Sequence, residues 1–353
     1  MKVLAKGLGG FVLLLAGVFA QAVQAAPAVL ERPALHSAKA ERSVMLGLAR
    51  AGQRLVAVGE RGIILLSDDD GASWRQANVP VSVNLTAVQF VDARQGWAVG
   101  HLGVVLHSSD GGETWSKQLD GIQAANRVLQ AAQASGDADA IAQAEAMVAD
   151  GPDKPFLDLY FLNERVGYLV GAYNLILRTD DGGQSWQSWM QHLDNPQALN
   201  LYAIRAWRGD LYIAGERGLL LRSRDGGEHF AALPSPYEGS FFGLLAARDG
   251  LLAYGLRGNA WWSADGGETW QALDTGVESA LAAALELADG RLLLAGQGGE
   301  LLVAQPGSAR AQSVPLRLAP GLASVIQAAD GSLASGGLSG IAARQIPEQS
   351  AQR

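Results

Sequence analysis

Short apolar runs separated by glycine-containing turns follow one another along most of the chain. A typical run is VVLHSS from Val104, which comes directly after a turn. Runs of this length, bounded by turn residues, predict β-strands, because an amphipathic helix repeats its apolar positions every three to four residues over a longer stretch. The pattern therefore predicts an all-β fold built from short strands.

The same strand–turn–strand unit recurs seven times. Clear copies are VGERGIILLS from Val58, VGHLGVVLHS from Val99, VGAYNLILRT from Val170 and AGERGLLLRS from Ala214, and three weaker copies follow. Their leading glycines are Gly59, Gly100, Gly171, Gly215, Gly255, Gly296 and Gly337, with spacings of 41, 71, 44, 40, 41 and 41 residues. A repeat of about 41 residues with four short strands is typical of a propeller blade. We expect one seven-bladed β-propeller over 26–353.

A second motif follows each of the first five leading glycines at a distance of ten residues. It reads Ser/Thr-x-Asp-x-Gly-x-Ser/Thr-Trp, as in SSDGGETW, with one degenerate copy, SRDGGEHF. Its aspartates and terminal aromatics are Asp69 and Trp74, Asp110 and Trp115, Asp181 and Trp186, Asp225 and Phe230, and Asp265 and Trp270. The carboxylate can accept backbone N–H groups within a tight turn, and glycine takes its positive φ, so we expect a structural role for these residues. The motif resembles the Asp-box, or bacterial neuraminidase repeat.

Two segments depart from the repeat. The seventh copy has no convincing fourth strand, and we expect residues 28–35 (AVLERPAL) to supply it and close the ring, at an edge position because of Pro33. The long spacing after the second copy holds residues 122–152, rich in Ala and Gln, with a break at Ser135-Gly136-Asp137. This pattern predicts a short helical hairpin in which Asp137 caps the second helix.

The first 25 residues are typical of a signal peptide. Lys2 and Lys6 precede the apolar run Leu8–Ala20, and small residues offer a cleavage point near Ala25. No later stretch is long and apolar enough to span a membrane. We therefore expect an exported, periplasmic protein without stable membrane insertion of the mature chain.

Composition narrows the function classes. With 27 Lys+Arg against 35 Asp+Glu the formal charge is −8, which argues against general attraction to nucleic acid. The absence of cysteine excludes disulfides, cysteine-ligated zinc and a lipidated N-terminal cysteine. The five histidines show no metal-binding spacing, and they are His36, His101, His107, His192 and His229. The sequence thus predicts no metal and no cofactor.

The phrases QGWAVGHLGVVLHSSDGGETW and VGYLVGAYNLILRTDDGGQSW, together with seven units and a signal sequence, resemble the photosystem II stability/assembly factor family. Its plastid and cyanobacterial members are lumenal seven-bladed propellers. The resemblance implies a non-catalytic accessory factor that binds a membrane or envelope protein partner, such as a transporter, during assembly. We expect a monomeric member from a non-photosynthetic bacterium.

In this family a cluster of arginines on one propeller face is associated with partner binding. Two residues after the leading glycines, this chain has Arg61, Arg217 and Arg257. Equivalent positions of a propeller lie in one ring on one face, so the predicted partner-binding set is Arg61, Arg217, Arg257, His101, Tyr173, Glu60 and Glu216. The alternative is that Glu60-Arg61 and Glu216-Arg217 are ordinary solvated turn residues.

Asp-boxes also occur in sialidases and other glycoside hydrolases, so a glycosidase or carbohydrate-binding propeller is the alternative function. The Asp-box takes no part in such chemistry, which needs two carboxylates, or an arginine trio with a tyrosine nucleophile. The Arg-Ile-Pro string that usually carries the first sialidase arginine is missing, and the nearest match is Glu31-Arg32-Pro33. We find no catalytic set and predict that the protein is not an enzyme.

Overall fold

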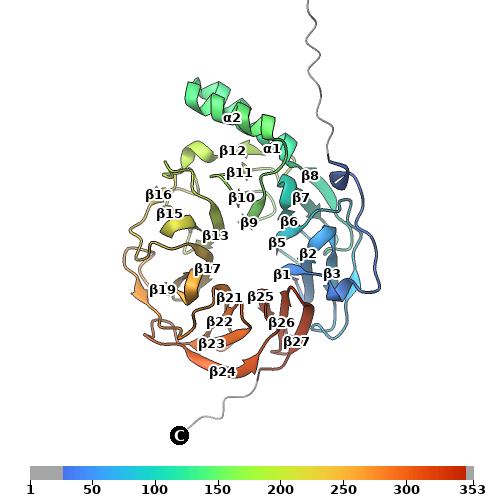
Figure 1. The fold of residues 1–353 in the computed structure, drawn as a ribbon, viewed down its shortest axis with the longest axis vertical. Helices are drawn as coiled ribbons and strands as arrows, with labels where there is room; N and C mark the ends of the chain where they lie inside the picture. Colours follow the sequence, from blue (N-terminus) through green and yellow to red (C-terminus); the bar gives the residue numbers. More distant parts are fainter. Residues whose placement is uncertain (1–26, 347–353) are drawn as a thin grey trace, which may run out of the picture.

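Seven small antiparallel sheets are arranged as blades around a central opening (Figure 1). The structure is a computed structural model that describes residues 27–346; the predicted signal peptide lies outside them. In every blade the strand order follows the sequence, and the first strand lies innermost. The predicted seven-bladed propeller is confirmed.

The blades differ little in construction. Blade 1 consists of β1 (Met45–Ala51), β2 (Arg54–Gly59), β3 (Ile64–Ser67) and β4 (Arg75–Gln76). Blade 2 consists of β5 (Leu85–Phe90), β6 (Gly96–Gly100), β7 (Val105–Ser108) and β8 (Ser116–Leu119). Blade 3 consists of β9 (Phe156–Phe161), β10 (Gly167–Gly171), β11 (Ile176–Thr179) and β12 (Gln187–Ser188). Blades 4 and 5 consist of β13 (Leu201–Trp207), β14 (Asp210–Gly215), β15 (Leu220–Ser223) and β16 (Ala231–Ala232); and β17 (Phe241–Ala247), β18 (Gly250–Gly255), β19 (Ala260–Ser263) and β20 (Gln271–Ala272). Blades 6 and 7 consist of β21 (Leu281–Glu286), β22 (Leu292–Gly296), β23 (Glu300–Ala304) and β24 (Gln312–Arg317); and β25 (Leu322–Gln327), β26 (Leu333–Gly337) and β27 (Gly340–Arg344).

The hydrophobic core is divided among the spaces between neighbouring blades. One cluster, for example, joins blades 2 and 3, where the rings of Trp97 and Phe161 stack with centroids 3.7 Å apart. Both side chains are almost fully buried. Because each blade covers the face of the next, closure of the ring leaves no large sheet face to solvent.

The prediction for residues 28–35 is wrong. Within residues 27–346 blade 7 has three strands, and Ala28–Leu30 forms a one-turn 3-10 helix, η1, far from it in the ring. Leu30 is 1% exposed and packs between blades 1 and 2, while Ala34 donates its N–H to Val79. The apolar side chains of this segment therefore find their cavity beside the connection between blades 1 and 2. Blade 7 closes the ring by packing β25 and β26 against β1.

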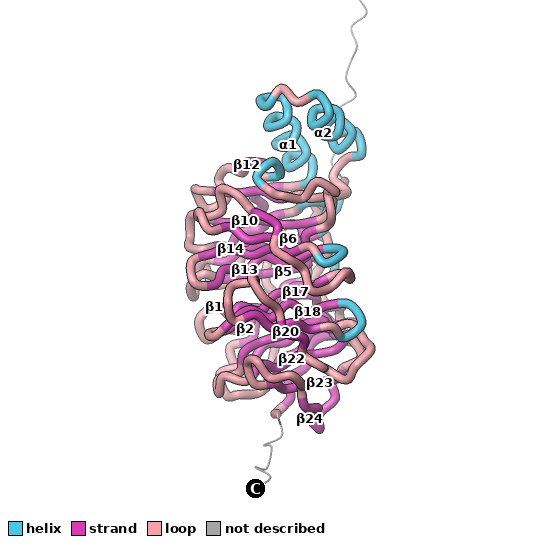
Figure 2. Tube along the Cα trace, turned by 90° about the vertical axis from the view of Figure 1, so that its left-hand side faces the viewer, coloured by secondary structure: helices cyan, strands magenta, loops and turns pink. Residues whose placement is uncertain are grey.

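The predicted helical hairpin is confirmed. Helix α1 (Gly121–Ser135) begins with a capping box made by Asp120 and Gln123, and α2 (Ala138–Asp150) begins after Asp137, whose carboxylate accepts two backbone N–H groups. Gly136 lies between them at a φ of 73°, the left-handed conformation that ends a helix. The hairpin projects from the outer rim beside blades 2 and 3 (Figure 2).

Candidate functional site

The turns between the second and third strands of all seven blades lie on one face of the ring, which we call the turn face. At each turn the first residue donates its backbone N–H to the carbonyl of the residue just before the inner strand of the same blade. The pairs are Glu60 with Val44, His101 with Asn84, Ala172 with Pro155, Glu216 with Asn200, Leu256 with Ser240, Gln297 with Ala280 and Leu338 with Gly321. The turns therefore surround one mouth of the central opening.

The second residue of five of these turns is large and has a positive φ. The values are 53° at Arg61, 55° at Leu102, 57° at Tyr173, 52° at Arg217 and 56° at Arg257. The next residue is a glycine, or Asn174 in blade 3, and it also has a positive φ. Two successive positive φ angles define a turn in which Asn-Gly is favoured, and a residue other than glycine costs about 1–2 kcal/mol there. The large side chains are thus held at positions where the backbone alone favours Asn or Gly.

Three of the five are arginines without a partner. Arg61, Arg217 and Arg257 are exposed, and their guanidinium groups make no ion pair or hydrogen bond within residues 27–346. Each backbone, in contrast, is fixed: the N–H of Arg61 donates to Oδ1 of Asn84 at 3.0 Å, for example. These turns therefore present free guanidinium groups on a rigid support.

Glu60 and Glu216, predicted to stand beside these arginines, have internal partners. The Glu60 carboxylate accepts the N–H of Val44 at 3.1 Å, and that of Glu216 accepts the side-chain amide of Asn200 at 2.9 Å. Both donor residues lie just before an inner strand, and the glutamates are half-buried. The two carboxylates thus stabilise the turns that carry Arg61 and Arg217.

Aromatic and aliphatic side chains share the turn face with the arginines. Tyr173 is 59% exposed, with the Lys154 ammonium 5.1 Å from its ring centroid, and Leu338 is 66% exposed in the blade 7 turn. His101 is exposed in blade 2. Leu338 was not predicted as a site residue, because the position compared between the repeats, two residues after the leading glycine, is Ser339 in blade 7. An apolar side chain in a two-residue turn was the signal that could have indicated Leu338.

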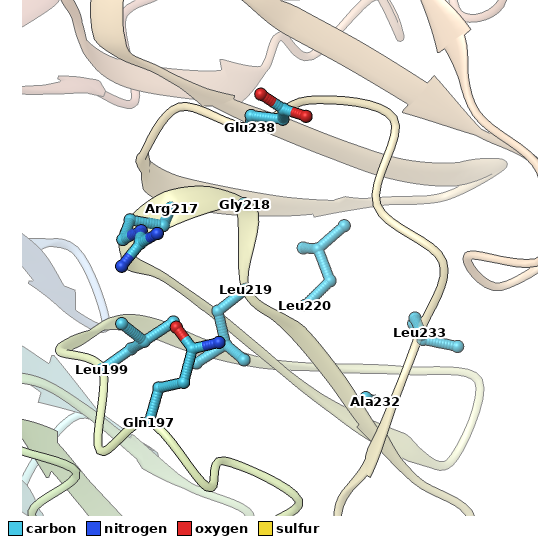
Figure 3. A pocket seen from close by; sticks show the side chains of 9 residues that line it. All are labelled: Gln197, Leu199, Arg217, Gly218, Leu219, Leu220, Ala232, Leu233 and Glu238. Carbon is cyan, nitrogen blue, oxygen red and sulfur yellow. The ribbon is translucent and has the colours of Figure 1, made fainter.

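A pocket of about 520 Å³ opens beside Arg217 (Figure 3). The connections that lead into and out of blade 4 form its walls, and its apolar lining comes from Leu199, Leu219, Leu220 and Leu233. Arg217 and Glu238 stand at its rim. The face can therefore bind an apolar side chain next to a charged one.

The five Asp-boxes lie on the opposite face, in the turns between third and fourth strands. In each, Oδ1 of the aspartate accepts a serine or threonine hydroxyl and a backbone N–H four residues later. In four copies Oδ2 accepts a second hydroxyl, and in blade 4 it contacts Nδ1 of His229 at 3.2 Å instead. Trp115, Trp186 and Phe230 are buried, while Trp74 and Trp270 are half-buried. In all five motifs the aspartate is therefore hydrogen-bonded within its own turn.

These hydrogen bonds predict acid sensitivity. They lower the pKa of Asp69, Asp225 and Asp265 to about 2. Because an unfolded aspartate titrates near 3.9, this stabilisation is complete above about pH 4 and is lost as the pH falls towards 2. Urea midpoints measured between pH 6 and pH 2.5 should fall over that window, and the fall should be smaller for Asp265→Asn. If the urea midpoint of Asp265→Asn fell with pH as steeply as that of the wild type, the hydrogen-bonded Asp265 carboxylate would not be a source of the acid sensitivity.

A family model described as "Photosynthesis system II assembly factor YCF48" matches residues 66–153 and 142–238. The curated "Photosystem II assembly lipoprotein Ycf48" of Synechococcus sp. (strain CC9902) is 36% identical over 77 residues, which is 22% of this chain and 23% of the relative. The aligned part thus spans about a quarter of that relative. The chain belongs to a photosystem II assembly factor-like family. The resemblance inferred from the repeats and Asp-boxes is confirmed.

Solved structures share the fold of this family member. "YCF48 bound to D1 peptide" superimposes with a TM-score of 0.62 at 17% identity, covering 89% of this chain and 99% of that one. YCF48 from Cyanidioschyzon merolae gives 0.61 at 15% identity, with 85% and 95% covered. The WD40 propeller of Doa1 also gives 0.61, at 10% identity. Similarity at this level shows the propeller fold alone.

Within residues 27–346 no helix has the length and apolar character needed to cross a membrane. The same residues contain no group of three or more histidine, aspartate or glutamate side chains placed to hold a metal ion.

Proposed function

We propose that the turn face binds a protein partner and that the chain acts as an exported, non-catalytic assembly factor for a membrane or envelope protein complex. The family supports an assembly role, and a propeller of the same fold, YCF48, has been solved with a D1 peptide. The partner of this chain would be an envelope complex such as a transporter, in a non-photosynthetic bacterium.

One observation carries this proposal: three unpaired arginines occupy turn positions that favour glycine or asparagine. Strained backbone positions persist where the surrounding structure holds them, and they cluster at functional sites. A free guanidinium makes bidentate bonds to a carboxylate and stacks on aromatic rings. Arg61, Arg217 and Arg257 are therefore suited to an acidic partner surface.

The apolar part of the turn face adds a second requirement. Tyr173 and Leu338 are exposed, and the pocket beside Arg217 is lined by leucines. Interfaces gain most of their binding energy from a few contacts that are rich in aromatic and arginine side chains and fill well-packed pockets. The partner segment should therefore carry acidic side chains interspersed with large apolar ones.

A binding role also agrees with the state of the Asp-box carboxylates. With a pKa of about 2, Asp69, Asp225 and Asp265 cannot act as general acids near neutral pH. Their oxygens already accept hydrogen bonds within their own turns. This favours a structural role for them.

Export rests on the first 25 residues, which lie outside the described part of the chain. The Synechococcus relative is a lipoprotein by name. This sequence has no cysteine, so it offers no thiol for a lipid. We infer a periplasmic protein whose contact with the membrane is through its partner.

Replacing Arg61, Arg217 and Arg257 together with asparagine is the direct test. Asparagine tolerates a positive φ, so the variant keeps the turns and loses only the charges and side-chain reach. Since a charged hydrogen bond contributes about 1.5–3 kcal/mol, we expect partner capture from envelope extracts to fall at least tenfold. The measurement is quantitative co-purification with cross-linking, using partners identified with the wild-type chain.

Arg208 provides a matched control. It is exposed, has a φ of 51°, and lies between β13 and β14, at the end of the blade opposite the turn face. Arg208→Asn should leave capture unchanged. Equal capture by the triple variant and the wild type would rule out the arginines as the binding set, and equal loss in Arg208→Asn would show that total charge is responsible.

A further inference from the structure

Most residues of the seven inner strands are apolar or small, but some carry a charge. Asp158 lies in β9 (FLDLYF), Arg205 in β13 (LYAIRAW) and Arg50 at the end of β1. Together with residues of β5 they line a pocket of about 260 Å³ inside the ring. Because the inner strands begin at the turn face and these residues lie in the middle or second half of their strands, the pocket is separate from the turn face.

Asp158 and Arg205 form the fixed part of this pocket. Nη1 of Arg205 lies 2.5 Å from Oδ2 of Asp158, and the same oxygen accepts the backbone N–H of Ile204 at 3.0 Å. The Asp158 side chain is only 10% exposed. Burial on its own would lower the pKa of Arg205, but the Asp158 carboxylate, together with Tyr254 and Tyr160, outweighs this effect and the pKa is raised. Arg205 is therefore a charged group held in one orientation.

Only Nη1 of the three Arg205 guanidinium nitrogens donates a hydrogen bond within residues 27–346. Nη1 also donates to the carbonyl of Ile204, whereas Nε and Nη2 have no partner within residues 27–346. The Arg205 side chain remains 35% exposed, and the pocket lies against it. The hydroxyl of Tyr160, which lines the same pocket, has no partner in the described chain either. Arg205 and Tyr160 thus line the same cavity, and both keep unused hydrogen-bond donors.

Arg50 lines the same pocket but differs from Arg205 in this respect. Its Nε, Nη1 and Nη2 donate to the carbonyl of Gly52, the carbonyl of Gln327 and the side chain of Gln53. Those acceptors are neutral and engage all three nitrogens, so Arg50 contributes positive charge but has no free Nε–Nη2 edge for a carboxylate. With Arg50 and Arg205 against Asp158, the charged lining of the pocket is positive by one.

We propose that this pocket is a carboxylate-binding site, in which Arg205 pairs with the ligand through Nε and Nη2 and Tyr160 donates a third hydrogen bond. The planar fork of a guanidinium matches the two oxygens of a carboxylate. A volume of about 260 Å³ accommodates a small organic acid or a single acidic side chain. The site does not depend on partner binding at the turn face.

Titration of the ¹⁵N-labelled full chain tests the proposal. Acetate should shift the side-chain Nε–H signal of Arg205 and the backbone amides of Ile204 and Tyr160, with saturation in the millimolar range. Sodium chloride at equal ionic strength should leave those signals in place. A short peptide with one glutamate and blocked ends distinguishes the sources: tighter binding than acetate indicates an acidic segment of a protein, and weaker binding indicates a free organic acid.

Two variants and one control keep the result specific. Arg205→Lys retains the charge opposite Asp158 but loses the fork, and should weaken acetate binding at least about tenfold. Tyr160→Phe, which leaves the ion pair intact, should weaken it severalfold, whereas Arg61→Lys, on the separate turn face, should leave it unchanged. The proposal would be overturned if the signals did not move at acetate concentrations up to 100-fold above the expected millimolar dissociation constant. Equal binding of acetate by the wild type and Arg205→Lys would also overturn it.

Discussion

Trp97→Ala is expected to lower the free energy of unfolding by about 3–5 kcal/mol, the range observed when a large buried aromatic is truncated. Trp97 is 1% exposed. Its ring stacks on Phe161 of the next blade at 3.7 Å and lies 4.9 Å from the ring of His107, so its removal opens a cavity between blades 2 and 3. Midpoints and slopes from urea unfolding, followed by fluorescence and circular dichroism, provide the measurement.

Tyr173→Ala serves as the control for this truncation. Tyr173 is 59% exposed, with the Lys154 ammonium 5.1 Å from its ring centroid, so its loss should change stability by no more than about 0.5 kcal/mol. If Trp97→Ala were no more destabilising than Tyr173→Ala, the contact between blades 2 and 3 would not be a main source of stability. Separation of the fluorescence and circular dichroism transitions in Trp97→Ala would instead show that the blades unfold independently.

The repeat, the Asp-boxes and the helical hairpin were predictable because their signals are local. The leading glycines recur every 40 to 44 residues except where the insertion lies, and Asp137 lies directly before an apolar helical pattern. The ring position of residues 28–35 was not predictable, since AVLERPAL carries a strand-like pattern that does not say which blades it will contact. Leu30 reaches a cavity between blades 1 and 2 that exists only after the ring has formed.

The candidate sites divide in the same way. Arg61, Arg217 and Arg257 could be placed on one face because equivalent repeat positions must share it. The hydrogen bonds that the Glu60 and Glu216 carboxylates accept come from Val44 and Asn200, each 16 residues earlier in the chain. No sequence pattern predicts these two hydrogen bonds. Asp158 and Arg205 come from different blades, and their only signal was a charge within an apolar strand.

Gly258→Ala should destabilise the protein by about 2–5 kcal/mol, the sum of a strained φ and a steric clash. Gly258 has a φ of 70°, and a Cβ there would lie 2.0 Å from the carbonyl oxygen of Val277. That oxygen belongs to the connection between blades 5 and 6, so either the turn or the connection must move. The free energy of unfolding, measured with urea, should fall well beyond the loss caused by an open turn glycine.

Gly276→Ala in the same connection is the matched control. Its φ of 65° is nearly the same, but no atom lies within 4 Å of the added Cβ, so only the backbone term of about 1 kcal/mol remains. Similar losses in the two variants would mean that the turn does not press against the connection. A larger loss for Gly258→Ala, together with weaker partner capture, would mean that this contact also fixes the position of Arg257, the residue before it. Rigid placement of the arginines would then follow from the same close packing that requires glycine.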